Sequence, residues 1–246
     1  GEGVRLTPDD IESLERATVA AVAPPDVAEI SGWICPFDDG TIGRGKSAAP
    51  LRHDLDASGV PDVEAAYRAR GLEPAYRVAD VPGLEAVRLE LTRRGYTRQQ
   101  PTVVMTANAD TVAEYAVPFA DLLDHPDEAW RQVFLGEGFD PVDGAHRVKR
   151  LTASPDALFG AVREGGRTVA VGALSFGYGW AGVHGMRTAL DRRGSGFASR
   201  LLALFGSAAL ARETPRIFLQ VEEANPARNL YRRAGFTEAW IYGYWR

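Results

Sequence analysis

The stretch Arg193-Gly194-Ser195-Gly196-Phe197-Ala198 decides how the second half of this sequence folds. It joins an apolar strand-like run, residues 180–188, to a helix-like run whose apolar positions are Phe197, Leu201, Leu204, Phe205 and Ala208. A glycine-rich loop at a helix start exposes backbone N–H groups that no helical carbonyl accepts. Together with the positive end of the helix dipole, these donors form a site for a diphosphate. A plain strand-to-helix loop is the alternative, and the stretch fits neither the mononucleotide P-loop nor the Gly-x-Gly-x-x-Gly pattern.

The elements around this loop form a regular series. Three strand-like runs precede it, at residues 157–162, 168–175 and 180–188. Gly165-Gly166 and Gly177-Tyr178-Gly179 separate them, which favours an antiparallel meander. A helix, a strand, a second helix and an aromatic strand follow, at residues 196–211, 216–221, 226–234 and 240–245. The predicted order is therefore β-β-β-loop-α-β-α-β.

The first half alternates helices and strands as well. Thr7-Pro8-Asp9-Asp10 predicts a helix start, and Pro24-Pro25 ends that helix. Asp38-Asp39-Gly40 suits a tight turn, so a β-hairpin is expected around it. Helix, strand, helix and strand then follow at residues 63–67, 73–78, 84–94 and 102–105. The polar stretch Ala107-Asn108-Ala109-Asp110 is the predicted domain boundary.

One short pattern occurs in both halves. Residues 91–97, Leu-Thr-Arg-Arg-Gly-Tyr-Thr, resemble residues 231–237, Tyr-Arg-Arg-Ala-Gly-Phe-Thr. Each combines a basic helix end, a glycine suited to a left-handed cap, an aromatic residue and a strand start. Two copies of one fold would explain the pattern, and so would the common chemistry of helix-to-strand turns.

Composition and charge exclude several classes of protein. The chain has 246 residues, a net charge of −5 and a single cysteine. No global positive field favours nucleic acid, and Cys35 cannot close an internal disulfide. No apolar run is long enough to cross a bilayer, and the N-terminal Gly-Glu-Gly-Val-Arg-Leu lacks the apolar stretch of a secretion signal, so a cytoplasmic protein is expected. His53, His125 and His146 lack the spacing of metal ligands, and no metal site is predicted.

With two motifs in place, the sequence resembles the GNAT superfamily of acyl-CoA-dependent N-acyltransferases. The pyrophosphate loop of that family reads Arg/Gln-x-x-Gly-x-Gly/Ala, which residues 193–198 match. Its second element is a strand, an asparagine and a helix ending Leu-Tyr-x-x-x-Gly-Phe, found here as residues 218–221, Asn225 and residues 230–236. The match covers residues 140–246, whereas residues 1–107 share only the helix-to-strand pattern.

The resemblance implies roles for the residues of these motifs. Arg193, Gly194, Ser195, Gly196, Phe197 and Ala198 would bind the pyrophosphate of acetyl-CoA, and the backbone of Met186, Arg187 and Thr188 would bind its pantetheine and polarise the thioester carbonyl. Tyr231 would donate to the departing thiolate, although it could be a half-buried helix tyrosine. Asn225 precedes Ala227 by two residues rather than the three usual in the family. It is therefore read either as a pantetheine ligand or as a helix N-cap.

Two questions about the acceptor side stay open in the sequence. His184 is the preferred candidate for a general base, with Glu222 and Glu223 as rivals and direct loss of a proton to water as a further alternative. Gly43-Arg44-Gly45-Lys46 is interpreted as a solvated basic loop. The aromatic end, residues 240–245, is interpreted as a strand packed on the sheet rather than a wall of the acceptor pocket.

The sequence therefore predicts a GNAT fold of α/β (α+β) type, with a mixed, largely antiparallel sheet flanked by helices. A degenerate N-terminal domain (1–107) would precede a catalytic domain (108–246), since residues 1–107 lack the phosphate loop. The predicted enzyme transfers an acetyl group from acetyl-CoA to a primary amine of a small molecule, peptide or protein, by direct attack in a ternary complex. A non-catalytic acyl-CoA-binding or dimerisation module is the alternative. No metal, nucleic acid or membrane partner is expected, and a homo-oligomer is left open.

Overall fold

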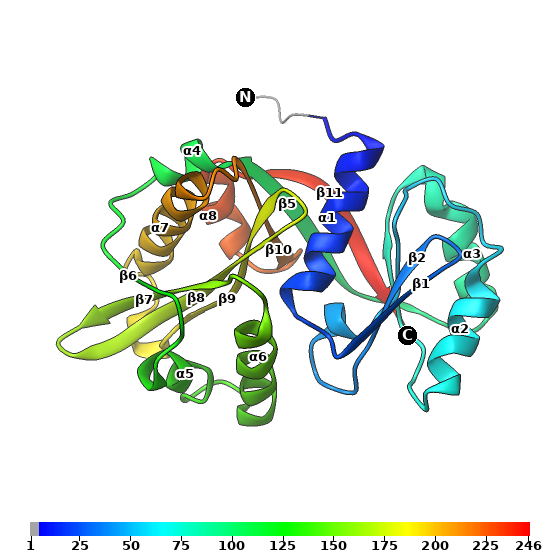
Figure 1. Cartoon of the computed structure of the whole chain (residues 1–246), viewed down its shortest axis with the longest axis horizontal. Helices are drawn as coiled ribbons and strands as arrows, with labels where there is room; N and C mark the ends of the chain where they lie inside the picture. Colours follow the sequence, from blue (N-terminus) through cyan, green and yellow to red (C-terminus); the bar gives the residue numbers. More distant parts are fainter. Residues whose placement is uncertain (1–4) are drawn as a thin grey trace.

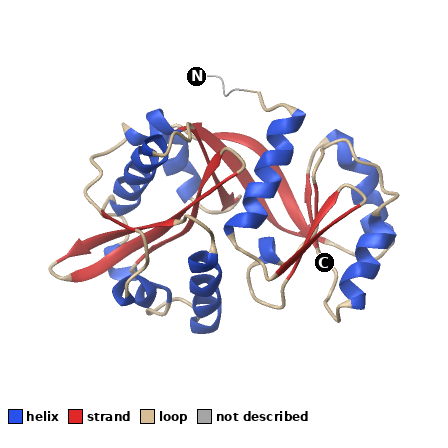
Figure 2. Cartoon of the chain, in the orientation of Figure 1, coloured by secondary structure: helices blue, strands red, loops and turns tan. Residues whose placement is uncertain are grey.

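An eight-stranded sheet runs through the whole molecule (Figures 1 and 2). The computed structural model describes residues 5–246; Gly1–Val4, part of the argument against a secretion signal, lie outside the described residues. The strand order is β4-β11-β5-β10-β9-β8-β7-β6, and only β9 and β10 pair in parallel. The bounds are β4 (Tyr76–Ala79), β5 (Arg98–Asn108), β6 (Asp121–Leu123), β7 (Leu158–Glu164), β8 (Arg167–Gly177), β9 (Trp180–Thr188), β10 (Arg216–Glu222) and β11 (Thr237–Trp245). The predicted mixed, largely antiparallel sheet is confirmed.

Helices cover both faces of this sheet. They are α1 (Pro8–Ala21), α2 (Val60–Ala69), α3 (Glu85–Arg93), α4 (Ala109–Ala113), α5 (Glu128–Phe134), α6 (Pro141–Ala153), α7 (Phe197–Ala211) and α8 (Ala227–Ala234), with 3-10 turns η1 (Gly43–Gly45), η2 (Pro82–Leu84) and η3 (Leu190–Arg192). In Figure 1, α7 and α8 lie above strands β7 to β9, and α5 and α6 lie below them. The apolar residues of α7 fill the core on the upper face, as the sequence predicts.

Helix α1 begins where the sequence predicts. The Thr7 hydroxyl accepts from the Asp10 N–H while the Asp10 carboxylate accepts from the Thr7 N–H, a capping box that satisfies two donors at the helix start. The helix then packs on β8 and β9. Its buried Glu15 forms an ion pair with Arg77 of β4, with 2.7 Å between Oε2 and Nη1. This contact ties α1 to the strands of the first half.

The hairpin of the first half turns at a different place from the one predicted. Strands β1 (Asp26–Ile30) and β2 (Trp33–Phe37) are joined by Ser31-Gly32, whose φ angles are +51° and +81°. Two left-handed residues form the type I′ turn that matches the twist of paired strands. Residues 38–40 instead begin a longer loop, and the His146 ring of α6 lies beside Gly40. The chain returns at β3 (Ala49–Pro50), which also pairs with β2.

The sheet passes through the predicted domain boundary. Strand β5, the last of residues 1–108, lies between β10 and β11, and β11, the last of the chain, lies between β4 and β5. Each half also presents one element order: β3-α2-β4-α3-β5 in the first and β9-α7-β10-α8-β11 in the second. In each series the first two strands run parallel to each other. Ala48, just before β3, forms a parallel bridge to Tyr76 of β4, and β9 pairs in parallel with β10. Each half thus holds the final strand of the other.

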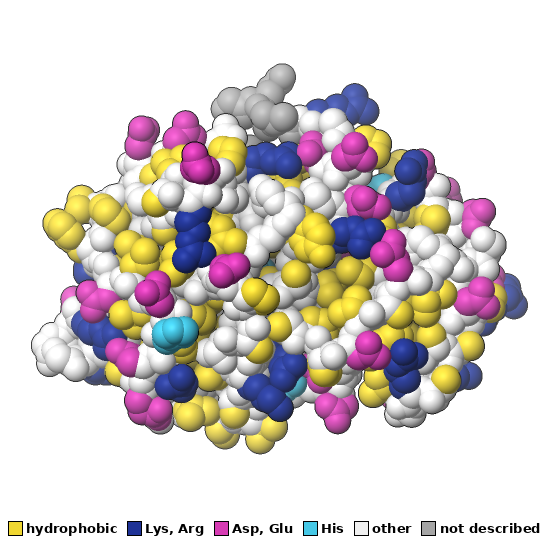
Figure 3. Space-filling model, viewed as in Figure 1, with side chains coloured by type: hydrophobic (Ala, Val, Ile, Leu, Met, Phe, Trp, Pro, Cys, Tyr) yellow, Lys and Arg dark blue, Asp and Glu magenta, His cyan; other side chains and the backbone are white. Residues whose placement is uncertain are grey.

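The surface carries both signs of charge. In Figure 3, basic and acidic side chains alternate over the visible face, and yellow apolar side chains lie between them. None of the helices in residues 5–246 is long and apolar enough to cross a membrane. Within the same residues, no cluster of histidine, cysteine, aspartate and glutamate is arranged to hold a metal ion.

Candidate functional site

The site begins where the two parallel strands separate. β9 and β10 pair only from Ala181–Ile217 to Val183–Leu219. Beyond that point neither strand has the other as a partner, so His184–Thr188 and Gln220–Glu222 line the two sides of an opening in the sheet. The carboxyl ends of both strands and the helices that follow them converge on this opening.

A β-bulge in β9 shapes the groove side of the opening. Gly185 and Met186 together face Gly172 of β8, because the register shifts between the Val171–Arg187 and Ala173–His184 pairs. Gly185 has a φ of +62°, and a Cβ there would lie 2.7 Å from Cδ1 of Leu151. A bulge leaves backbone groups outside the ladder and re-aims the residues that follow. Arg187 and Thr188 stay paired with β8, and the other edge of Met186–Thr188, which has no partner in β10, faces the groove.

The N-terminus of α7 forms the second wall. Gly194 and Gly196 have φ angles of +82° and +79°, and nothing lies within 4 Å of a Cβ built on either one. No side chain caps the helix start, and no acidic residue stands in its first turn. The first N–H groups of α7 therefore face open space without an acceptor, which is the arrangement that binds an anionic phosphate.

A cavity of about 750 Å³ fills the space between these walls and α8. It is lined by all the loop residues predicted from the sequence, together with residues of β9 and α8: Met186, Arg187, Thr188, Arg193, Gly194, Ser195, Gly196, Phe197, Ala198, Asn225 and Tyr231. Phe139, from the loop before α6, closes the far side and stacks with Arg187, whose guanidinium carbon lies 4.5 Å from the ring centroid. The structure thus brings the two sequence motifs to one groove.

Tyr231 lies at the end of this groove. Only 9% of the residue is exposed, and its hydroxyl has no hydrogen-bond partner among residues 5–246. Burial raises the pKa of the phenol, so the hydroxyl stays protonated and available as a donor at neutral pH. The side chain lines both the groove and a second cavity beyond it.

The second cavity, of about 350 Å³, lies on the other side of the opening in the sheet. Met186, Arg187, Asn225 and Tyr231 border both cavities, so the two spaces meet there. The other polar lining residues come from both halves of the chain: Arg44, Gln100 and Thr102 from the first, and Arg147, His184, Gln220, Glu222, Tyr242 and Tyr244 from the second. The first half thus contributes part of the wall.

His184 lines this second cavity but is held as a neutral ring. It is 4% exposed, and its Nε2 lies 3.0 Å from the Ser175 hydroxyl. Burial, with a smaller contribution from the charge of Arg44, lowers the pKa of the imidazole well below its usual value. Its role as general base stays a prediction. Of its rivals, Glu222 lines the cavity, whereas Glu223 does not.

Asn225 takes up the capping position that the sequence left open. Its Oδ1 accepts from the Ala227 N–H at 2.9 Å, at the start of α8. The same residue borders both cavities, and no described residue accepts from its side-chain amide. The cap is thus observed, and binding of pantetheine through the remaining N–H groups stays a prediction.

Around the second cavity the structure corrects one interpretation from the sequence and extends another. Arg44 does not belong to a solvated loop: its Nε is buried without a partner, and its side chain lines the second cavity. Tyr242 and Tyr244 are part of the strand, as expected, yet they also line that cavity. In the sequence, the two glycines that flank Arg44 are the sign that this segment is closely packed. Gly43 lies against the Tyr244 ring, and a Cβ built on Gly43 would come within 2.8 Å of that ring.

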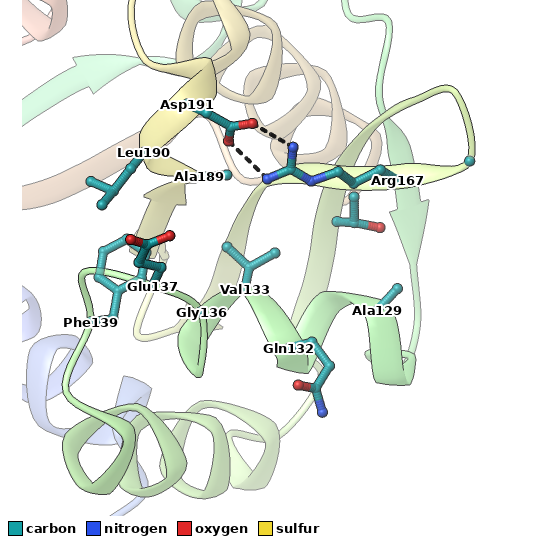
Figure 4. Close-up of a pocket in the computed structure, with 12 residues that line it drawn as sticks. Ala129, Gln132, Val133, Gly136, Glu137, Phe139, Arg167, Ala189, Leu190 and Asp191 are labelled. Carbon is teal, nitrogen blue, oxygen red and sulfur yellow. Dashed lines mark hydrogen bonds and ion pairs between the residues drawn. The ribbon is translucent and has the colours of Figure 1, made fainter.

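A third cavity, of about 860 Å³, lies beside α5 and η3 (Figure 4). Arg167 and Asp191 form a bidentate ion pair at its rim, with 2.7 and 2.8 Å between their nitrogen and oxygen atoms. Phe139 lines both this cavity and the groove, but neither Tyr231 nor Met186 borders it. It therefore lies outside the candidate site.

The bulged strand, the uncapped α7 terminus and the parted strands define an acyltransferase fold of the GNAT type. Residues 8–245 match the family model described as "Probable histone acetyltransferase Rv0428c C-terminal", so the chain belongs to that family. No curated protein matches the chain.

Solved structures agree on the fold. A GCN5-related N-acetyltransferase from Kribbella flavida has a TM-score of 0.69 at 15% identity, covering 96% of this chain and 94% of its own. A putative acetyltransferase from the GNAT family of Novosphingobium aromaticivorans has a TM-score of 0.60 at 21% identity, covering 95% and 96%. A tandem GNAT protein from the clavulanic acid biosynthesis pathway has a TM-score of 0.57 at 14% identity, covering 98% and 96%.

Proposed function

We propose that the protein is an N-acetyltransferase that transfers the acetyl group of acetyl-CoA to a primary amine. The observation that carries this proposal is the junction of the two cavities at Tyr231 and Met186. A long groove with an anion site at one end meets a small cavity at the other. This is the layout that a transfer between two separately bound substrates requires.

The groove has the chemistry to hold acetyl-CoA as a substrate. The N–H groups around Gly194 and Gly196 and the positive end of α7 would bind the pyrophosphate, and Arg193 adds a positive charge without an acidic partner among the described residues. The extended backbone of Met186–Thr188 would pair with the amides of the pantetheine arm. The thioester would then lie beside the bulge, near Tyr231.

In the proposed reaction, the amine in the second cavity attacks the thioester carbonyl carbon. The new C–N bond forms as the carbonyl oxygen gains negative charge, which a backbone N–H of the bulge stabilises. The C–S bond then breaks, and the Tyr231 hydroxyl donates to the departing thiolate. The proton lost by the amine passes to His184, to Glu222 or to water. No covalent intermediate on the protein is required.

The proposal extends to the organisation of the chain. Residues 1–107 and 108–246 would be two copies of one fold, the first without a phosphate loop. The shared element order and the reciprocal placement of β5 and β11 support this division. The predicted cytoplasmic location is retained as part of the proposal.

Release of free thiol from acetyl-CoA tests the proposed function. The purified chain is incubated with acetyl-CoA and a panel of primary amines, and thiol release is followed in parallel with the mass of the acylated amine. We expect amine-dependent thiol release with a matching acetylated product. Thiol release at the same rate without any amine, or none with any amine, would contradict the proposal.

A further inference from the structure

We propose that the second cavity selects acceptors that carry a carboxylate beside the amine, and that Arg44 binds this carboxylate. The inference rests on the proposed function and names the substrate class of the same site. It assigns a role in acceptor specificity to a residue of the first half of the chain.

Arg44 is a positive charge without a counter-ion. No hydrogen bond or ion pair joins it to another residue of 5–246, and its Nε is fully buried without an acceptor. Burial lowers the pKa of its guanidinium, and the charges of Arg147 and Arg77 lower it further, whereas Tyr244 and Tyr242 act in the opposite direction. Buried charges in proteins are ordinarily paired, because an unpaired ion loses its hydration without compensation. A bound anion would supply the missing partner.

The neighbouring charges do not replace that partner. Arg147 and Arg187 also line the cavity, and both are engaged with Asp143, at 2.8 and 3.6 Å. The other oxygen of Asp143 accepts from the Thr41 hydroxyl at 2.6 Å. Asp143 thus pairs with Arg147 and Arg187 but not with Arg44, whose guanidinium has no carboxylate partner among residues 5–246.

The chemistry of the cavity favours a carboxylate attached to a small amine. A planar guanidinium binds a carboxylate through two parallel hydrogen bonds. Glu222, the only acidic residue among those that line the cavity, would attract the ammonium end of the same molecule. At about 350 Å³ the cavity is at the small end of ligand sites, which suits an amino acid. The amine end would lie toward Tyr231 and Met186, where the groove opens.

The architecture places Arg44 there by close packing. Gly43 has no room for a side chain, because a Cβ would lie 2.8 Å from the Tyr244 ring, and η1 then directs the next residue into the cavity. The Ser47 hydroxyl donates to the Gly43 carbonyl at 2.6 Å and fixes the turn. The loop thus places Arg44 in the wall of the cavity that Tyr242 and Tyr244 of β11 also line.

Matched pairs of acceptors test the inference on the unmodified protein. Lysine is compared with cadaverine, ornithine with putrescine and phenylalanine with phenethylamine, and a lysine-containing histone-tail peptide is included. We expect kcat/KM for the amino acids to exceed that for their decarboxylated partners by roughly 10- to 100-fold, the value of a hydrogen-bonded charge. Equal use of both members of each pair, a preference for the peptide, or no turnover of any acceptor by a chain that binds acetyl-CoA would overturn it.

Variants locate the effect at Arg44. Arg44→Gln should raise KM for the amino acids by a similar factor, with a much smaller effect on the decarboxylated amines and no effect on KM for acetyl-CoA. Arg44→Lys should recover part of the loss, since it keeps the charge without the planar fork. Arg52→Gln, in an exposed Arg52–Asp54 pair, is the control. Equal losses with both acceptor classes in Arg44→Gln would assign the residue a structural role and overturn the inference.

Failure of the proposed function is recognised separately. If the unmodified chain binds no acetyl-CoA, the transferase proposal falls, and the amino acids are titrated directly into the unmodified and Arg44→Gln proteins by calorimetry. Binding to the unmodified chain alone would uphold an Arg44 carboxylate site, and equal or absent binding would overturn it.

Discussion

Tyr231 combines a buried ring with an unpaired hydroxyl at the junction of two cavities. Because that hydroxyl bonds no described residue, its removal should leave the fold intact. Tyr231→Phe is therefore expected to lower kcat roughly 100-fold, the scale of a lost proton donor, with an unchanged unfolding midpoint. Stopped assays of thiol release and a thermal melt measure both quantities. Tyr178→Phe, on the exposed β8–β9 turn, is the control, and a Tyr231→Phe enzyme as active as this control would contradict the role.

The burial of His184 leads to a prediction about how kcat/KM depends on pH. Burial lowers the pKa of its ring well below the usual value, so the imidazole is already neutral at neutral and alkaline pH. Any rise of kcat/KM with pH in that range should then come from loss of the acceptor's own ammonium proton. The rise should persist in His184→Gln, which keeps a polar group near Ser175. A rising limb that disappears in this variant would assign the titration to His184 instead.

At this scale, the positions of the groove residues and of His184 could be predicted from the sequence, whereas the position of Arg44 could not. Residues 193–198 are contiguous, and the loop geometry follows from their glycines and from the helix they start. Arg44 belongs to a cavity wall whose other members come from β5, α6, β9, β10, α8 and β11 and from the loop before α8, so its surroundings depend on the tertiary fold. Local sequence around Arg44 favours a solvated loop, and only close packing against Tyr244 places it in the cavity.

Among the elements, the bulged strand β9 matters most for the groove. Gly185→Ala would force a side chain onto a φ of +62° and against Leu151, so a cost of about 1–3 kcal/mol in unfolding free energy is expected, together with loss of acetyl-CoA affinity. Gly179→Ala is the matched control, because Gly179 has a φ of +80° but nothing within 4 Å of its Cβ. Denaturant unfolding and calorimetry compare the two. If Gly185→Ala bound acetyl-CoA with full affinity, the bulge would not be part of the acetyl-CoA binding site.

Helices and central strands follow the sequence closely, because capping residues and apolar spacing are local. Thr7 and Asp10 form the expected capping box, and β7, β8 and β9 turn at the expected glycines. The first hairpin was misplaced because Asp38-Asp39-Gly40 has turn chemistry, while Ser31-Gly32 carries the left-handed backbone. Residues 38–40 instead pack against α6, where the His146 ring lies beside Gly40, and that contact spans more than a hundred residues.

On the scale of the whole molecule, the two halves are held together by an exchange of strands. β5 bonds both β10 and β11, so a fragment of residues 109–246 would leave β10 with an open edge. We expect this fragment to aggregate and to lack a cooperative unfolding transition, and co-expression with residues 1–108 to restore a soluble complex. Size-exclusion chromatography and thermal melts measure this. A monomeric fragment that unfolds cooperatively would show that the exchange is dispensable.

This interlocking could not be read from the sequence. The repeated helix-to-strand pattern indicates two similar halves, and the polar stretch after residue 106 coincides with the end of β5. Strand pairing across that stretch depends on non-local hydrogen bonds, which leave no periodicity in either strand. The sequence therefore predicts the elements of each half, but not that the last strand of each half pairs with strands of the other half.

The central claim is that the N-terminus of α7 binds the diphosphate of acetyl-CoA. Calorimetric titration of acetyl-CoA into the unmodified chain, Gly196→Asn and Gly196→Asp tests it most directly. Asparagine and aspartate both tolerate the left-handed backbone of this position and differ only in charge. The account predicts binding to the unmodified chain and an affinity at least about ten-fold weaker for the aspartate variant than for the asparagine variant, as repulsion between anions requires. Equal affinities of the two variants, or no binding to the unmodified chain, would contradict it.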